Sequence, residues 1–522
     1  DRTISFFGRA NYSLMDRYLL TFTIRADGSS KFTKGNRWGY FPAAAFAWRI
    51  IEEPFMEPVK EFMSNLKLRL SYGTAGNNRI GNSLYETSYK AYSSGKYYGA
   101  GGEQNPHYTL NNEQLANPDL KWETTITRNI GLDFGFFNER LTGNIDYYWN
   151  TVKDLLIEQS ITAIGYKTMQ QNIGQTSNRG VELTLNAAIL QKKDYSLNFN
   201  FNIGFNKNKV DKLANGISSM SYNSGAFSSD MRGRDDYRVI VGEPLGIVWG
   251  YVYDGVYGVD DFVTYTDENG KTQFQFDKSG NYILKEGVTD NTYTTASSYG
   301  GLRPGAMKLK DQDGDHKITE KGDRVIIGRT QPKFTGGFGL SGNYKWFDIS
   351  ANFNFVVGND VYNMDKMVSS QSYRNSYANL RAEMAPVTLG GKAWTYLDQS
   401  NGTIITDYET LKAMNANASA ATMSDNNPVP TSWAVEDGSF LRLQNLTVGF
   451  TLPKDWTKKF ACNQFRLYCT LNNLFCLTGY DGYDPEVNSA IRNSKTSGVT
   501  PGADFSAYPK SFSWTAGVNI TF

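Results

Sequence analysis

The sequence predicts an all-β protein, an antiparallel up-and-down β-barrel whose strands span a membrane. Three observations lead to this fold class. Apolar and polar residues alternate with a period of two in many segments, no run approaches the roughly 18 apolar residues that a membrane helix needs, and the connections between the alternating segments are by turns short and long. The alternation puts hydrophobic side chains on one face of each strand and polar side chains on the other.

The alternation is clearest in four segments. In Tyr195–Phe205 every second side chain is apolar and those between are small or polar, and Phe347–Phe355, Phe465–Leu471 and Phe512–Phe522 repeat the pattern. A tilted strand of about 9–11 residues crosses the apolar band of a membrane, and these segments have about that length. Each segment therefore suits a strand with lipid on one side and a wet interior on the other.

Along the chain we expect about thirteen such strands. Their expected starts lie near Ile4, Arg17, Gly39, Leu66, Thr124, Leu141, Gly180, Tyr195, Lys333, Trp346, Ser439, Gln464 and Lys510. Charged residues between the apolar positions are expected to point into the lumen, mostly in pairs. They include Arg69, Asp133, Asp146, Asp348, Arg442 and Arg466.

The connections are ordered by length. Short turns follow the odd-numbered strands, at Leu14–Asp16, Glu52–Asn65, Phe137–Arg140, Gln191–Asp194, Tyr344–Lys345 and Pro453–Asn463. Long loops follow the even-numbered strands, at Asp27–Trp38, Thr74–Glu123, Glu158–Arg179, Lys207–Pro332, Val356–Gly438 and Phe475–Pro509. In a meander the two sets fall on opposite ends, which is typical of bacterial outer-membrane barrels with short periplasmic turns and long extracellular loops. A soluble propeller would instead repeat at a fixed spacing.

The number of strands bears on what precedes the sequence. Bacterial single-chain barrels close with an even number of strands, so thirteen indicates that strands before Asp1 are missing. The C-terminal closing strand is present, ends on Phe522 and is expected to finish on the periplasmic side.

Composition excludes several other classes. With 53 Lys and Arg against 52 Asp and Glu, no positive surplus favours nucleic acid. Cys462, Cys469 and Cys476 lack the spacing of a zinc site and are expected to be packing residues. The two histidines, His107 and His316, leave little for a catalytic triad, so no enzyme is predicted.

Several segments resemble the SusC/RagA-type TonB-dependent outer-membrane transporters of Bacteroidota. The resemblance rests on YFPAAAFAWRI, NLKLRLSYGTAGNNRIG, NPDLKWETTITRNIGLDFGF, SNRGVELTL, VGEPLGIVWGYVYDGVY, the segment from Pro332 to Asn363, VEDGSFLRLQNLTVGFTLP and NNLFCLTGYDGYDPEV. These occur in family order over essentially the whole chain.

The resemblance implies a barrel of about twenty-two strands that is closed by a plug. It identifies residues 1–522 as the C-terminal part of this barrel, with the plug domain, the TonB-box and the first barrel strands absent from the sequence. It also implies a SusD-like surface lipoprotein as a lid over the long loops and energised import through the TonB complex.

One acidic loop is a candidate metal site. Asp311, Asp313 and Asp315 are followed by Lys317 and Asp323 in DQDGDHKITEKGD, and carboxylates at alternate positions can converge on a hard cation such as Ca²⁺. The loop departs from an EF-hand, because His316 replaces the turn glycine and Gly322 the bidentate glutamate. The alternative is an acidic turn held by its own Asx hydrogen bonds.

The long loops are the expected binding surface, since loops of this length are uncommon without a function. Aromatic rings beside amide and guanidinium donors suit stacking on sugars or cradling a peptide. The substrate-binding candidates are Asn77, Asn78, Arg79, Tyr97, Tyr98, Trp249 and Tyr251. Such residues also hold loops together or pack against a lid protein.

The sequence thus predicts import of an oligosaccharide or a peptide across the outer membrane. Uptake of another large nutrient such as a metal chelate, or a non-transporting adhesin that binds through its loops, are the alternatives. Sugar and peptide importers share the motifs above, so the sequence does not choose between these substrates.

Overall fold

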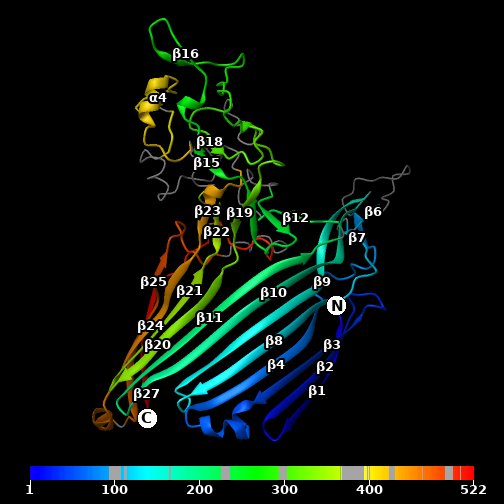
Figure 1. Cartoon of the computed structure of the whole chain (residues 1–522), viewed down its shortest axis with the longest axis vertical. Coiled ribbons are helices and arrows are strands. Elements are labelled where there is room, and N and C mark those ends of the chain that lie inside the picture. The colour runs from blue at the N-terminus through cyan, green and yellow to red at the C-terminus, as the bar shows by residue number, and fades with distance from the viewer. Residues whose placement is uncertain are drawn as a thin grey trace.

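The computed structural model describes residues 1–92, 107–110, 114–163, 166–214, 216–224, 235–292, 302–364, 366, 393–396, 398, 400–421, 429–460, 462–487, 498–505 and 507–522. Figure 1 shows two regions, a large tilted sheet and a body of short elements above one of its ends. We call the sheet the wall and the body the crown.

The wall is an antiparallel meander (Figure 1). In order across the sheet its strands are β1 (Thr3–Leu14), β2 (Tyr18–Ser29), β3 (Trp38–Arg49), β4 (Met63–Asn77), β8 (Glu123–Phe136), β9 (Leu141–Ala163), β10 (Tyr166–Gln191), β11 (Tyr195–Lys212), β20 (Phe334–Tyr344), β21 (Phe347–Val357), β24 (Phe440–Thr451), β25 (Gln464–Thr478) and β27 (Ser513–Thr521). A short β7 (Gln114–Leu115) joins β10 in parallel and completes the 14-stranded sheet. The predicted all-β antiparallel fold is confirmed.

The two faces of the wall differ in polarity, and the register keeps each face continuous. Phe201 pairs with Phe338, which pairs with Phe353, and the last two rings stack with centroids 4.5 Å apart. On the other face Asn200 pairs with Gly339. Because paired residues of neighbouring strands share a face, rings meet rings and polar groups meet polar groups. The expected division into an apolar and a polar face is confirmed.

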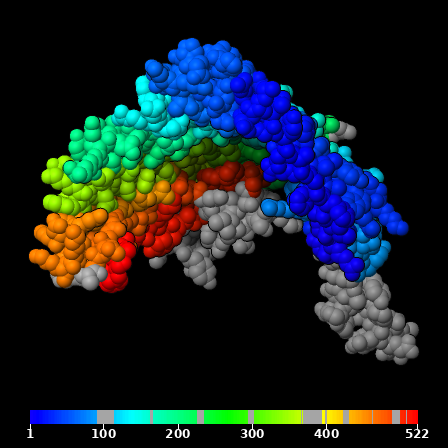
Figure 2. Space-filling view, turned by 90° about the horizontal axis from the view of Figure 1, so that it is seen from below, coloured from blue at the N-terminus to red at the C-terminus, as the bar shows by residue number. Residues whose placement is uncertain are grey.

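Ion pairs on the polar face join strands that are adjacent or separated by one strand. Arg69 of β4 reaches Asp133 of β8 at 2.8 Å and Asp146 of β9 at 2.9 Å, and Arg466 of β25 reaches Asp348 of β21 at 2.5 Å. The expected pairing of these charges is confirmed. Figure 2 shows the wall curved into an open arch, and the segment after β25 contacts its polar face through Arg442 of β24.

The short connections gather at one end of the wall, as predicted. Three are tight turns in which non-glycine residues take positive φ, at Met15 and Asp16, at Phe137–Glu139 and at Lys345. Two contain short helices, namely η1 (Ile50–Glu52) and η2 (Pro54–Val59), and α5 (Lys454–Thr457) and η6 (Lys458–Phe460). Among the described residues no helix is long and apolar enough to cross a membrane.

One predicted loop is wrong. Residues 158–179 were expected to form a long loop, but β9 and β10 continue as a hairpin whose pairing runs from Leu141 with Ala187 to Ala163 with Tyr166. The hairpin rises past the end of β20, beside β11 (Figure 1). The residues of this extension are mostly polar, so no apolar alternation marks it, and register shifts near Asn172 and Gly174 break the period further.

The crown is built from the three long connections β11–β20, β21–β24 and β25–β27. Its strands are β12 (Ser219–Tyr222), β13 (Tyr237–Ile240), β14 (Ile247–Gly250), β15 (Tyr253–Val256), β16 (Thr264–Thr266), β17 (Thr272–Phe274), β18 (Met307–Leu309), β19 (Val325–Arg329), β22 (Asp360–Asn363), β23 (Val435–Asp437) and β26 (Ala503–Asp504). Its helices include η3 (Val259–Asp261), α4 (Tyr408–Met414) and η5 (Ser432–Ala434). A separate hairpin, β5 (Tyr89–Tyr92) and β6 (His107–Leu110), lies in the β4–β8 connection.

Candidate functional site

The three connections of the crown are packed into one body. β22 pairs with β23 and with β26, which joins the second connection to the third, and Tyr251 of the first bridges Thr431 of the second. One buried cluster takes residues from all three: Tyr237, Val248, Tyr362, Met364, Ala434, Ala503 and Phe505. The Tyr237 hydroxyl also donates to the carbonyl oxygen of Pro501 at 2.8 Å. These loops therefore form a packed platform at the open end of the wall.

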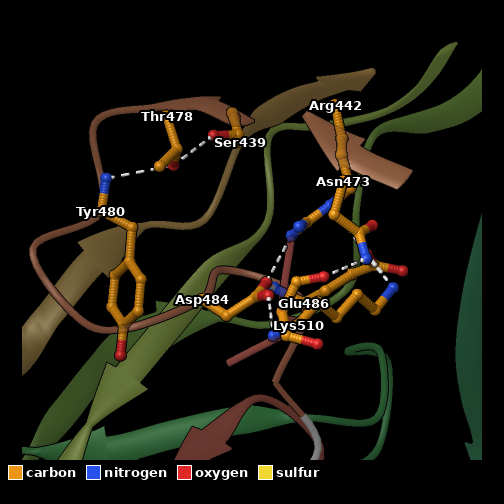
Figure 3. Close-up of polar contacts among 9 residues, drawn as sticks. Ser439, Arg442, Asn473, Thr478, Tyr480, Asp484, Glu486 and Lys510 are labelled. Atoms are coloured by element: carbon orange, nitrogen blue, oxygen red, sulfur yellow. Dashed lines mark hydrogen bonds and ion pairs between the residues drawn. The ribbon is translucent and has the colours of Figure 1, made fainter. Parts of the chain in front are cut away.

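An ion-pair network with a buried centre, Arg442 and Asp484, anchors the third connection to the wall (Figure 3). Arg442 of β24 is 4% exposed and its Nη2 lies 2.5 Å from Oδ1 of Asp484. Its Nε lies 3.3 Å from Oε2 of Glu486, which also pairs with Lys510. The second oxygen of Asp484 accepts the backbone N–H of Lys510 at 3.2 Å. Because breaking the buried Arg442–Asp484 pair would leave an uncompensated charge, Asp484 and Lys510 are held close to β24.

A second buried carboxylate lies inside the crown. Asp236 is 1% exposed, and both of its oxygens accept hydrogen bonds from Ser224, one from the backbone N–H at 2.8 Å and one from the hydroxyl. Burial raises the pKa of Asp236 to about 6, because the two hydrogen bonds offset only part of the lost hydration. Desolvation also raises the pKa of the adjacent Tyr237.

Two of the predicted binding residues, Asn77 and Asn78, form hydrogen bonds with residues of neighbouring segments at the end of β4. The Asn77 amide donates to Oε1 of Glu123 at 2.9 Å, and the Asn78 amide donates to Oγ of Ser29 at 3.1 Å. Arg79 is exposed, with its backbone N–H bound to Asn77. Among the described residues, Arg79 is thus the member of this group whose side chain is open to solvent, and ligand contact by the group stays a prediction.

The predicted aromatic residues have different surroundings. Tyr97 and Tyr98 lie outside the described residues. Trp249 of β14 is half-buried, with the Arg238 guanidinium 4.5 Å from its ring. Tyr251 is 3% exposed and packs with Leu309, Ile318 and Val429. The burial of Tyr251 favours the packing alternative over direct ligand contact.

The acidic loop brings three carboxylates together. One oxygen from each of Asp311, Asp313 and Asp315 lies within 4.8 Å of the other two. Partial desolvation, and then repulsion from Asp315, Asp323 and Asp311, raises the pKa of Asp313. Desolvation acts in the same direction on Asp311, but the N–H groups of His316 and Gly314 outweigh it and lower the pKa of Asp311. The crowding of negative charge favours a cation.

The other two predicted ligands of that loop have structural tasks. Asp323 is fully buried, and its oxygens accept the backbone N–H groups of Gln312 at 2.8 Å and Thr319 at 2.7 Å. The N–H of Lys317 donates to Oδ1 of Asp315 at 2.7 Å. The Asx-type hydrogen bonds of the alternative reading are therefore present, and they leave Asp311, Asp313 and Asp315 as the cluster that could hold an ion.

The sequence analysis did not single out the buried or ion-paired residues of the crown, namely Asp484, Glu486, Lys510 and Asp236. They lie in loops without periodicity, and each acquires its role from a partner at least 12 residues away along the chain. The only available signal was local: Asp484 and Glu486 belong to the GYDGYDPEV segment that carried the family resemblance.

Comparison with known proteins assigns the chain to a family. Residues 1–308 match the family described as "TonB dependent receptor-like, beta-barrel". The chain belongs to this family of TonB-dependent receptors. It is 32% identical over 521 residues to TonB-dependent receptor P3 of Formosa agariphila, and 31% identical over 532 residues to TonB-dependent receptor SusC of Bacteroides thetaiotaomicron. Each alignment covers 99% of this chain.

The fold is similar to that of a solved structure, the RagAB peptide transporter, with a TM-score of 0.71 and 24% identity. All of this chain and 48% of that chain are aligned. The chain likewise covers 45% of P3 and 44% of SusC, so it spans about half the length of the relatives it matches. The SusC/RagA-type resemblance is confirmed, and the family indicates a place in the outer membrane.

Proposed function

We propose that the chain is part of a TonB-dependent importer that takes up an oligosaccharide or a peptide, with a SusD-like surface lipoprotein as its lid. The observation that carries the proposal is the crown. It joins three long connections through one buried cluster at one end of the wall, while the opposite end carries short turns. A packed platform of this kind is better suited to binding a large solute and a protein lid than to binding a small ion.

The proposal also fixes the orientation in the membrane. The crown faces the outside, the short turns and the C-terminus face the periplasm, and the apolar face of the wall contacts outer-membrane lipid. We further propose that the remaining barrel strands, a plug domain and a TonB-box are supplied by other parts of the complete protein. The similarity to SusC and to the RagAB peptide transporter supports these assignments.

Uptake by whole cells tests the proposal. Cells that express the complete protein and cells with its gene deleted are given fluorescent oligosaccharide or peptide pools, with and without a protonophore. We expect uptake of one pool that is lost on deletion and on collapse of the proton-motive force. Uptake that survives the protonophore would indicate a passive pore. Surface binding without uptake would indicate an adhesin. Uptake of a metal chelate alone would show that the substrate is a metal chelate and not an oligosaccharide or a peptide.

We further propose that Asp311, Asp313 and Asp315 bind Ca²⁺ in the crown. Hard oxygen ligands, the convergence of three carboxylates and their mutual repulsion support it. The ion would stabilise the turn and take no part in transport.

A further inference from the structure

A row of basic and aromatic side chains crosses five neighbouring strands of the wall on its apolar face. Tyr72 of β4 pairs with Arg128 of β8, and Arg179 of β10 pairs with both Trp149 of β9 and Lys207 of β11. The guanidinium of Arg128 lies 4.6 Å from the Trp149 ring, which links the two halves. We call these five residues the basic row.

The side on which the basic row lies follows from the register. An apolar row lies on the same five strands, two residues closer to the short-turn end than the basic row. Its members are Leu70, Ile130, Tyr147, Val181 and Phe205. Its members are 39% to 53% exposed. Residues two apart share a face of a strand, and Arg69, Asp133 and Asp146 occupy the opposite face. The face therefore changes from fully apolar to cationic within one row, as at the edge of a membrane's apolar band.

The cations of the basic row have no acidic partner. Arg179 and Lys207 are exposed and Arg128 is half-buried, and no ion pair within the described part of the chain includes any of them or the next cation, Lys209. The nearest carboxylate along β11, Asp211, is engaged by Ser177 and Gln175. A surplus of positive charge thus stands at the boundary without a counter-ion from these strands.

Two guanidinium groups converge on one ring. Arg128 lies 4.6 Å and Arg179 lies 5.0 Å from the ring centre of Trp149, and Arg128 is also steered by a 3.3 Å hydrogen bond to Oγ1 of Thr151. Two like charges beside one ring repel each other, and an anion bound near both would offset that repulsion. Guanidinium groups match the geometry of phosphate oxygens, so phosphate is the anion they suit best.

An apolar depression lies next to these cations on the same face. Leu70, Ile130 and Tyr147 line it together with Arg128 and Trp149. A free phosphate ion gains nothing from contact with an apolar surface, whereas an acyl chain would bury that surface. Cations at the boundary and an apolar hollow beside them match the two ends of a lipid.

We propose that Arg128 and Arg179 bind the phosphate of a lipid headgroup in the outer leaflet, with an acyl chain of that lipid in the adjacent depression. The inference rests on the proposed orientation, in which the crown end of the wall faces the outside. Lys207 and Lys209 add attraction for the same headgroup, and Trp149 fixes the two guanidinium groups in place.

Native mass spectrometry of the complete protein in detergent tests the inference, with purified lipid A as the probe. The variant is Arg128→Gln with Arg179→Gln. The matched control is Lys192→Gln with Lys193→Gln, which removes two exposed charges in the turn at the other end of the wall. We expect the variant to bind lipid A about tenfold more weakly or worse, and the control to bind like the wild type.

Two further arms use the wild-type protein and decide the matter even if the variant does not fold. Enzymatically dephosphorylated lipid A should bind at least about tenfold more weakly than lipid A, and equimolar inorganic phosphate should not displace lipid A. Equal binding of both lipids, displacement by inorganic phosphate, or undiminished binding by a folded variant would overturn the inference. Loss of lipid binding with normal substrate uptake separates this result from a failure of the proposed import function.

Discussion

The wall and the crown treat their hydrophobic side chains in opposite ways. On the wall Ile349 is 51% exposed and Val518 is 52% exposed, whereas in the crown Tyr362 and Phe262 are fully buried. The wall therefore has to find its apolar environment outside the chain, and the crown makes its own. One region is stabilised by lipid and the other by packing in water, so each should respond to a different kind of substitution.

The largest effect is expected from a cavity in the crown. Tyr362→Ala removes a buried ring that lies 6.3 Å from the Tyr237 ring in the cluster joining all three connections. Truncation of a buried aromatic costs about 3–5 kcal/mol. Hydrogen exchange should show the crown opening while the wall keeps its heat-resistant migration in detergent. The exposed Tyr265→Ala is the control, and simultaneous loss of both regions would deny their independence.

The wall should fail through its apolar face instead. Phe353→Arg, or Phe201→Arg, places a charge on the face assigned to lipid and should cost about 2–4 kcal/mol near mid-bilayer. Asn200→Ser on the polar face should be nearly neutral. Urea unfolding in lipid vesicles measures all three. If arginine at both positions left the unfolding curve unchanged, the assignment of the apolar face would be wrong.

A pH dependence should distinguish the crown further. The pKa of Asp236 is about 6 in the folded crown, against an ordinary value near 4, so the folded state holds the proton more tightly. Crown stability should then fall as the pH rises from about 4 to about 6, by up to about 3 kcal/mol, and change little above that. Hydrogen exchange across this range measures it. Asp236→Asn should flatten the profile, and an equally steep profile in that variant would assign the effect to another group.

The smallest effect is expected from calcium. At a concentration of ten times its dissociation constant, a bound ion stabilises the folded state by about 1.4 kcal/mol. Adding Ca²⁺ should protect amides near Asp311 from exchange, and Asp313→Asn should abolish that protection. Protection that is unchanged by the substitution would leave the turn held by its Asx hydrogen bonds alone.

The wall could be predicted from the sequence because its signal is local and periodic. Strands such as Tyr195–Lys212 and Leu141–Ala163 begin at the expected residue, since alternation marks where a lipid-facing strand starts. The far part of the β9–β10 hairpin was not predicted, because residues 158–179 are mostly polar and show no apolar period.

The crown could not be predicted in the same way. The surroundings of Tyr251 include Thr431 and Val429 from another connection, and those of Asp236 include Ser224, 12 residues away; no short-range pattern encodes these contacts. Composition pointed to aromatic, functional loops, but it could not separate a ring that packs inside the crown from one that faces a ligand. The acidic loop was predicted in part. Its carboxylates at alternate positions could be recognised in the sequence, but the burial of Asp323 could not.

The most direct test of the import proposal is purification of the complete protein from native outer membranes, with mass spectrometry of its N-terminus and of every co-purifying protein. We expect a plug-bearing region before the wall and a surface lipoprotein held by the crown, which is released when Tyr362→Ala opens the crown. A mature N-terminus close to Asp1 and no lipoprotein partner would exclude TonB-dependent import and favour a passive pore or an adhesin.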